Sequence, residues 1–344
     1  MASKRSADYR MSQNRNASFA PIALPDEQMQ VRVVWLYYME GRTQGEIAEA
    51  LSTNRLRVNK IIAEARRSGL VTITLNSRLT SCIALEQQLA AEFSLNRAII
   101  VPTPEDEELI PVLLGQAAAD YLVQLLNGGN IRGVGVGWGA TLREMVRHMP
   151  SLRRPDICVN SVMGGLTHGI EINTFDIASD LARQLHAECS YLAAPIYAGS
   201  PESRTAIIRQ DVFETAFRQI EANDVIVLSI GDMTERSLLM RYGLPKNINI
   251  DELLAAGACG DVLGQFVDKI GRPIDHAINR CAIAPDLETL RAIPNVVFTS
   301  GGLNKVHAIA AVLLSGLGNV VICDEDTARQ ARQLAIELRT SRTS

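Results

Sequence analysis

Residues 43–62 read TQGEIAEALSTNRLRVNKII, and this stretch decides the fold of the N-terminal part of the chain. Counted from Gln44, apolar side chains stand at the fourth, eighth, fifteenth and eighteenth positions, with a small alanine at the fifth. Two short helices crossing at roughly 90–120° share one core only if each presents a single apolar stripe, with a small residue at the crossing. The spacing therefore predicts a helix-turn-helix with the core residues Ile47, Ala48, Leu51, Val58 and Ile61.

Capping residues indicate where these two helices begin and end. Thr43, followed three residues later by Glu46, predicts a capping box at the start of a helix over 43–51. Residues 52–54 make the turn, and a basic helix over 54–68 stops at Gly69. The face of this second helix that points away from the core would enter the major groove. The residues predicted to contact DNA are Gln44, Thr53, Asn54, Arg55, Arg57, Asn59 and Lys60.

The alternative is a helical hairpin without a special function, because amphipathic helix pairs are common. Two residues also depart from the usual pattern: Ser52 stands where glycine is usual, and Thr53 stands where an apolar residue is usual. The flanking sequence favours DNA binding, since a helix is predicted over 26–40 and a strand of strict period two over 71–75. Helix, helix, basic helix and strand is the order of a small winged DNA-binding domain.

Charge is distributed unevenly along the 344 residues, although the net charge is only −4. Residues 1–80 hold twelve lysines and arginines against seven acids, and the remainder holds 22 against 31. A basic excess at the helix-turn-helix suits binding to phosphates. The length itself suits two domains. We expect a disordered basic tail over 1–25, a DNA-binding domain over 26–80, a linker helix over 81–96 and an effector-binding domain over 97–340.

Cysteine and histidine usage argues against a metal site. The six cysteines are scattered without Cys-x-x-Cys spacing, and the five histidines are equally dispersed. We therefore predict no metal and no cofactor. The sequence shows no signal peptide and no apolar run approaching about 18 residues, which predicts a protein of the reducing cytoplasm.

A connecting helix is predicted over 78–94, because Leu85, Leu89 and Phe93 repeat at every fourth position. This stripe could pack on its own domain or on a second subunit. The second option is favoured in a DNA-binding chain, because half-sites are read by paired recognition helices.

Beyond residue 97 the pattern changes to short apolar runs alternating with longer amphipathic segments. This rhythm predicts a doubly wound α/β domain, in which helices cover both faces of a parallel sheet. The expected strands are 98–101, 131–136, 157–163, 189–193, 225–229, 295–299 and 319–323. The expected helices are 111–126, 140–149, 173–186, 203–221 and 303–317.

Ligands of such domains bind beyond the carboxyl ends of the strands, so the strand-to-helix turns are the candidate sites. Residues 133–142 and 161–168 contain glycine turns, and Trp138 in the first could stack on a sugar ring. A tight turn without a ligand is the alternative. In residues 299–308, Lys305 enters a helix start, where a cation is unfavourable. It therefore needs an anionic ligand or a salt bridge, and both stay open. Asp261 could accept hydrogen bonds from sugar hydroxyls, whereas Asp268 could be a turn residue.

Taken in order, the segments VGVGWGATL (134–142), MGG (163–165), AGACGD (256–261), FVD (266–268) and GGLNKVHAI (301–309) resemble the SorC family (DeoR-like) of sugar-binding bacterial transcriptional regulators. The resemblance implies an effector domain related to sugar-phosphate isomerases and deaminases, and homotetramers or homodimers on a DNA operator. It places Trp138, Thr141, Asp261 and Lys305 at the effector site. With the turns, the predicted effector-binding residues are Gly137, Trp138, Gly139, Ala140, Thr141, Gly164, Gly165, Asp261, Gly301, Gly302 and Lys305.

One departure from the family pattern concerns the ligand. In the family, a hydroxyl residue usually stands just before the tryptophan, and often another stands before the threonine. Here these two positions are Gly137 and Ala140. Fewer hydroxyls weaken a phosphate cradle, which favours an unphosphorylated polyol. The sequence thus predicts a regulator of sugar or polyol catabolic genes, with repression favoured, whose DNA affinity is switched by a sugar, polyol or sugar-phosphate. The alternative is a sugar-phosphate isomerase or deaminase with a regulatory N-terminus, but no histidine or glutamate in these turns completes an acid/base set.

Overall fold

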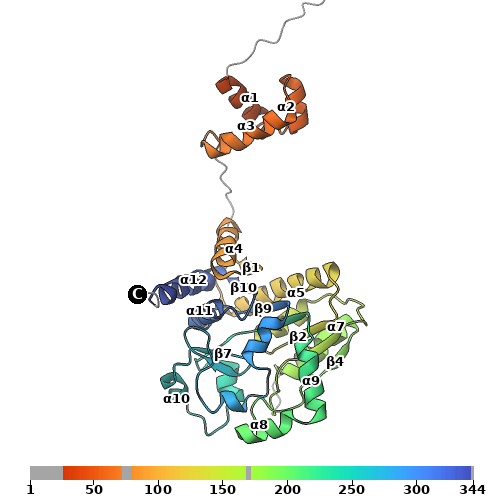
Figure 1. Cartoon of the computed structure of the whole chain (residues 1–344), viewed down its shortest axis with the longest axis vertical. Coiled ribbons are helices and arrows are strands. Elements are labelled where there is room, and N and C mark those ends of the chain that lie inside the picture. Colours follow the sequence, from red (N-terminus) through yellow and green to blue (C-terminus); the bar gives the residue numbers. More distant parts are fainter. Residues whose placement is uncertain (1–25, 72–78, 168–171, 342–344) are drawn as a thin grey trace, which may run out of the picture. The chain divides into compact units, whose positions relative to one another are not determined.

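The computed structural model describes residues 26–71, 79–167 and 172–341 of the chain (Figure 1). The chain forms two compact units, Met1–Asn76 and Ser77–Ser344. The first holds helices α1 (Asp26–Tyr38), α2 (Gln44–Ala50) and α3 (Arg55–Arg67). These three helices lie within one or two residues of their predicted bounds.

A small apolar core holds the three helices together, and the predicted spacing is confirmed. Ile47 and Val58 are fully buried, Ala48 and Ile61 nearly so, and Leu51 packs at the edge. The capping box is also present: the Thr43 hydroxyl accepts from the Glu46 amide, and the Glu46 carboxylate accepts from the Thr43 amide at 2.8 Å. Helix α2 therefore begins where its sequence predicts.

The turn between α2 and α3 explains the unusual Ser52. This residue has φ +51°, the left-handed conformation that glycine adopts most easily. The Thr53 amide donates to the Ala48 carbonyl at 2.8 Å, and the Asn54 side chain caps α3 by accepting from the Arg57 amide at 2.8 Å. Serine thus occupies the conformation usual for glycine. The predicted strand over 71–75 lies outside the described residues, apart from Val71.

The second unit is built on a seven-stranded parallel sheet, in the order β1-β10-β9-β5-β2-β3-β4 (Figure 1). All seven predicted strands are present, and every pairing between them is parallel. Their bounds are β1 Arg97–Val101, β2 Gly133–Val136, β3 Cys158–Ser161, β4 Glu188–Ser190, β5 Val225–Leu228, β9 Asn295–Thr299 and β10 Val320–Asp324.

Alternate side chains of the sheet point into two separate cores, because neighbouring residues in a strand face opposite sides. Val134 and Val136 belong to the core beneath α5, α6 and α7, whereas Ile226 and Leu228 belong to the core beneath α4, α9, α11 and α12. The predicted doubly wound α/β domain is therefore confirmed. The helices are α4 Leu79–Phe93, α5 Ile110–Gly128, α6 Ala140–His148, α7 Thr174–Leu185, α8 Pro201–Ile208, α9 Asp211–Glu221, α10 Ile250–Ala255, α11 Val306–Ser315 and α12 Glu325–Thr340.

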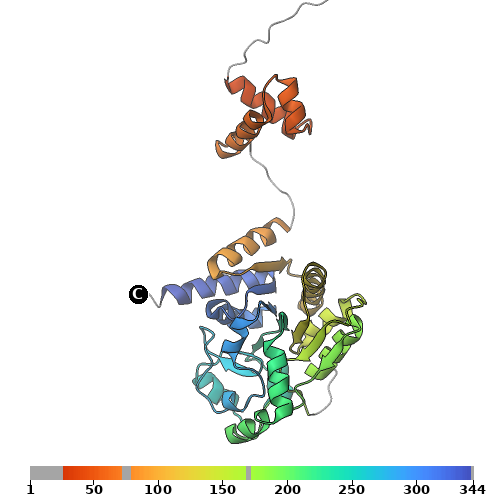
Figure 2. The same cartoon turned by 45° about the vertical axis from the view of Figure 1, so that its right-hand side comes forward.

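The apolar stripe of helix α4 could pack on its own domain or on a second subunit, and the structure shows the first, which was the less favoured option. Leu85 and Leu89 are buried in the core of the second unit. Helix α4 lies beside α12, where the Arg332 guanidinium donates to the Glu92 carboxylate at 2.8 Å (Figure 2). The apolar stripe of this helix is therefore used within its own chain.

Two further features differ from the expected elements. The helix predicted over 203–221 is two helices, α8 and α9, which meet at Arg209 and Gln210. Among the described residues, one helix, Glu107–Gly128, is long and apolar enough to cross a membrane by length and composition. The sequence had predicted no apolar run approaching this length. Leu114 and Leu122 of this helix are buried against the sheet, as in a core helix.

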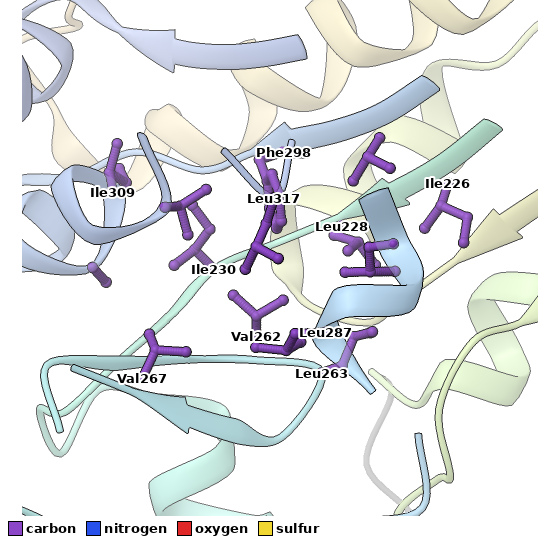
Figure 3. Packing of buried hydrophobic residues seen from close by; sticks show 14 of the residues in the cluster. Ile226, Leu228, Ile230, Val262, Leu263, Val267, Leu287, Phe298, Ile309 and Leu317 are labelled. Atoms are coloured by element: carbon purple, nitrogen blue, oxygen red, sulfur yellow. The ribbon is translucent and has the colours of Figure 1, made fainter. Parts of the chain in front are cut away.

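A second, antiparallel sheet was not predicted. It consists of β6 (Gly231–Asp232), β7 (Gly260–Val262) and β8 (Gln265–Val267). Val262 of β7, Leu263 in the turn after it and Val267 of β8 belong to the same apolar core as Leu228 and Phe298 of the parallel sheet (Figure 3). This packing brings residues of the segment 231–263 up to the carboxyl ends of the parallel strands.

Candidate functional site

A cavity of about 680 Å³ lies at the carboxyl ends of β2, β5 and β9. This is the edge at which open α/β sheets bind ligands. Five stretches of sequence and the single residue Met163 line it: residues 107–111, 137–141, 228–239, 261–263 and 301–305. Leu228 and Leu263, which belong to its wall, are among the packed side chains of Figure 3.

Nine of the eleven predicted effector residues line this one cavity. Gly164 and Gly165 do not, because they serve close backbone packing. A Cβ on Gly164 would lie 2.2 Å from the Pro195 carbonyl oxygen, and one on Gly165 would lie 2.4 Å from the Phe175 ring. The nine that line it are Gly137, Trp138, Gly139, Ala140, Thr141, Asp261, Gly301, Gly302 and Lys305.

The turn 137–141 forms one wall of the cavity. Gly139 is the N-cap of α6 and has φ +129°. Any residue other than glycine would be strained in this backbone conformation. None of the described side chains caps this helix start, so the first backbone amides of α6 lack a side-chain partner. Trp138 is half-buried and packs against both apolar cores, which holds its ring in the wall.

Asp261 lies at the inner end of the cavity and is only 4% exposed. Its Oδ2 accepts from the Gly264 amide at 3.1 Å, whereas none of the described residues hydrogen-bonds to its Oδ1, which is itself buried. Burial raises the pKa of Asp261 to about 6, although the Gly264 amide and the Lys305 charge act in the opposite direction. Gly231 makes room for this carboxylate, since a Cβ there would lie 1.8 Å from Oδ1.

Asp232 is a second buried carboxylate of the cavity, and sequence analysis missed it. Its Oδ1 accepts from the Thr234 amide at 2.8 Å and from the Thr234 hydroxyl. Its Oδ2 accepts from the Asn304 amide group at 2.9 Å. A signal was available, because Asp232 follows the predicted strand 225–229 and so stands in a strand-end turn.

Lys305 reaches the same end of the cavity from the start of α11. Its Nζ donates to the Ser300 hydroxyl at 3.2 Å, and none of the described carboxylates lies within ion-pair distance of it. Burial lowers the pKa of Lys305, while the charges of Asp232 and Asp261 raise it. Of the two expected partners, the salt bridge is therefore not found among the described residues, where Lys305 has a hydroxyl partner and two carboxylates acting at longer range.

An exposed ion pair lies at the mouth of the cavity. Arg236 and Glu107 approach to 3.8 Å, and their side chains are 81% and 62% exposed. An exposed pair of this kind contributes little to stability. Among the described residues, no group of three histidines, cysteines or acids is placed to hold a metal ion.

In the N-terminal unit, the predicted DNA-contacting residues lie on or next to α3. Arg55, Asn59 and Lys60 are exposed, and none of the described residues forms an ion pair with Arg55 or Lys60. Arg57 differs, because its guanidinium donates to Asp26 at 3.1 Å. Of the other predicted residues, Gln44 begins α2 and Thr53 lies in the turn before α3, and both are partly buried. Asn54 is the exposed N-cap of α3.

Comparison with known proteins identifies the family of the chain. Residues 77–331 match the family described as "Putative sugar-binding domain". The chain is 29% identical to the erythritol catabolism regulatory protein EryD of Brucella abortus over 304 residues, covering 88% of this chain and 96% of that protein. It is 30% identical to the transcriptional regulator LsrR of Escherichia coli over 308 residues, covering 88% and 94%.

Solved structures show the same fold. A DeoR family transcriptional regulator from Listeria monocytogenes superposes with a TM-score of 0.67 at 25% identity, covering 73% of this chain and 99% of that one. The full-length sorbitol operon regulator SorC from Klebsiella pneumoniae superposes with a TM-score of 0.68 at 24% identity, covering 90% and 99%. This chain therefore belongs to the family of that sugar-binding domain, within the SorC (DeoR-like) group of transcriptional regulators.

Proposed function

We propose that this protein is a DNA-binding repressor of sugar or polyol catabolic genes, switched by a small sugar, polyol or sugar-phosphate. The observation that carries the proposal is the single cavity that joins residues 137–141, 261 and 301–305 with Asp232. Small-molecule sites are concave, with a few convergent polar groups. Carboxylates, a lysine and a tryptophan face form such a set for a polyhydroxy ligand.

The N-terminal helices supply the DNA-binding half of the proposal. Helix α3 ends in Arg66 and Arg67, and it exposes Arg55 and Lys60 on the side away from the buried Val58. Side chains of this kind on an outward helix face contact phosphates and base edges in the major groove. A cytoplasmic location follows for a protein that acts on the operator.

We further propose that the chain acts as a homodimer or homotetramer. Two recognition helices read two half-sites of an operator, so one helix-turn-helix per chain requires a second copy. An effector changes DNA affinity only through its different affinity for two arrangements of that assembly. A ligand that touches both 137–141 and Lys305 links two βα units, and this gives a physical source for such a difference.

The test begins by selecting an operator from a random-sequence DNA library with the full-length protein. Sugars, polyols and their phosphates are then screened for thermal stabilisation and for a change in operator affinity by gel shift. The proposal predicts one compound that does both. The enzyme alternative predicts turnover of a sugar-phosphate, because Asp261 and Lys305 would then move protons. Turnover without any ligand-dependent gel shift would contradict the proposed function.

A further inference from the structure

Helix α3 carries an exposed leucine on the side opposite its core. The helix packs against α1 and α2 (Figure 1), and its core residues include Val58, Ile61 and Ile62. Because an α-helix turns by about 100° per residue, Leu56 lies on the opposite side from Val58. Its side chain is 81% exposed, more than any other large hydrophobic side chain that the structure describes. Leu56 therefore takes no part in the core of the N-terminal unit.

The residues that share this face with Leu56 are polar, small or basic. Asn59, Lys60, Ala63 and Arg67 follow Leu56 at helical spacing, and all four are exposed. None of the described residues forms an ion pair with Lys60. The face is therefore a single apolar side chain surrounded by groups that donate hydrogen bonds or carry positive charge.

A second group of exposed apolar side chains in the same unit provides a contrast. Val31, Trp35 and Met39 repeat at every fourth position along and just beyond α1, so they form a continuous stripe. Contiguous apolar patches of this kind are typical of contacts with other proteins. Among the described residues of α3, Leu56 is the one large apolar side chain that is exposed. An isolated leucine among cations fits a partner that is apolar at one point and anionic around it.

The position of Leu56 along α3 indicates what that partner is. Leu56 is the second residue of α3, and recognition helices contact base edges with their N-terminal residues. The thymine C5-methyl group is the apolar feature of the major groove, and the phosphates on both sides of the groove are anionic. Duplex DNA therefore offers the complement of Leu56 and its basic neighbours.

We propose that Leu56 contacts the C5-methyl group of a thymine and specifies a T·A pair in each half-site of the operator. Lys60, one turn further along the helix, binds phosphate. Arg57 lies to the side of this face, where its guanidinium donates to Asp26 at 3.1 Å. The proposal rests on the proposed DNA binding by α3. It adds a base-reading residue to the predicted DNA-contacting residues, which are all polar or basic and do not include Leu56.

Replacement of thymine by uracil tests the contact directly, because it removes only the methyl group and keeps the base pair. The operator is selected with the full-length protein, and versions with uracil at single positions are compared by fluorescence anisotropy. We expect affinity to fall by about fourfold at one position of a half-site, as the loss of one buried methyl group predicts. Uracil at that position in both half-sites should lower affinity by about fifteenfold, because distant contacts add. Unchanged affinity at every thymine overturns the inference.

A methyl group placed on another base gives the converse test. Replacing the T·A pair by C·G removes the methyl group and also changes the hydrogen-bonding groups of the pair. 5-Methylcytosine at the same position returns a methyl group to the groove without restoring thymine. We expect the operator with 5-methylcytosine to bind about fourfold more tightly than the operator with cytosine. Equal affinity for these two operators would show that the protein does not contact the methyl group.

A substitution assigns the methyl contact to Leu56. Leu56→Ala should fold like the wild type, because the side chain is exposed and alanine is the best helix former. The variant should bind the thymine and uracil operators with affinities within about twofold of each other, since its methyl contact is already lost. The salt dependence of binding should not change, because no charge is removed. A Leu56→Ala variant that still prefers thymine by the wild-type factor overturns the assignment.

Two control variants separate this inference from the proposed function. Lys60→Ala should lower affinity for both operators and reduce the salt slope by about 1, yet keep the preference for thymine. Met39→Ala removes an exposed apolar side chain outside α3 and should change neither property. If Lys60→Ala binds weakly but the thymine preference does not depend on Leu56, only this inference fails. If Lys60→Ala and Leu56→Ala both bind every operator like the wild type, α3 does not bind DNA and the proposed function loses its basis as well.

Discussion

The two units of the chain present their functional residues in opposite ways. In the N-terminal unit the residues proposed to bind DNA come from one continuous stretch and lie exposed on α3. In the α/β unit the cavity residues come from five stretches and Met163, all between positions 107 and 305, and Asp232 and Asp261 are almost fully buried. The first surface can change without affecting the fold beneath it, whereas the second site is part of the core.

This difference has an energetic consequence. An exposed arginine or lysine stabilises its domain little, so its replacement should change binding alone. A buried carboxylate changes both the ligand affinity and the stability of the fold, because its charge is poorly solvated. The following experiments use this contrast.

The largest effect is expected when Arg55 and Lys60 are both replaced by alanine. Specific operator affinity should fall by about a hundredfold or more, because a base contact contributes about 1–3 kcal/mol and a phosphate contact adds to the salt dependence. Fluorescence anisotropy at two salt concentrations measures both the operator affinity and its salt dependence. The Tm of the double variant should equal that of the wild type. Arg57→Ala serves as the comparison and should lose less, since Arg57 is bonded to Asp26. Wild-type affinity in the double variant would show that α3 is not the DNA-binding surface.

A smaller effect, on stability, is expected for Asp261→Asn without ligand. The pKa of Asp261 is raised from 3.8 to about 6, so the folded protein favours the neutral carboxyl group. The contribution of the neutral Asp261 carboxyl group to the free energy of unfolding is present below pH 4 and is lost as the pH rises through 6. The asparagine should therefore raise the free energy of unfolding by about 3 kcal/mol at pH 7.5, with a gain that disappears toward pH 4. Urea unfolding at several pH values checks this, and a loss independent of pH would contradict it.

The smallest effect is expected when the N-terminal unit is removed. Residues 77–344 form one compact unit with their own two cores, into which α4 packs. This fragment should fold, keep its effector affinity within about twofold and stay oligomeric. Calorimetry and sedimentation are the measurements. A monomeric fragment would assign oligomerisation to the DNA-binding unit.

Elements that are determined by neighbouring residues were predicted from the sequence, whereas elements that depend on residues far apart in the chain were not. Helices α2 and α3 were located closely, because Thr43, Glu46 and Asn54 act on neighbouring amides. The parallel strands were found because continuous apolar runs identify strands covered on both faces. The sheet β6–β8 was missed, since strands of two or three residues show no period. The relation to sugar-phosphate isomerase and deaminase folds stays a prediction.

The candidate site shows the same limit. Glycine turns after strands predicted eight of the nine cavity residues, and the family resemblance added Asp261. The same turns also predicted Gly164 and Gly165, where close packing against Pro195 and Phe175 leaves no room for a Cβ. Asp232 carries no local motif, because only the pairing of β6 with β7 brings it beside Asp261. Local chemistry therefore identifies turns, whereas the tertiary pairing decides which turns meet.

The measurement that tests the central claim most directly is operator affinity with and without the identified effector, in the wild type, Lys305→Ala and Trp138→Ala. Both residues line the cavity, and both belong to the α/β unit rather than to α3. We predict that both variants bind the operator like the wild type in the absence of ligand and no longer respond at the effector concentration that switches the wild type. A normal response in either variant would contradict the claim that this cavity controls DNA binding.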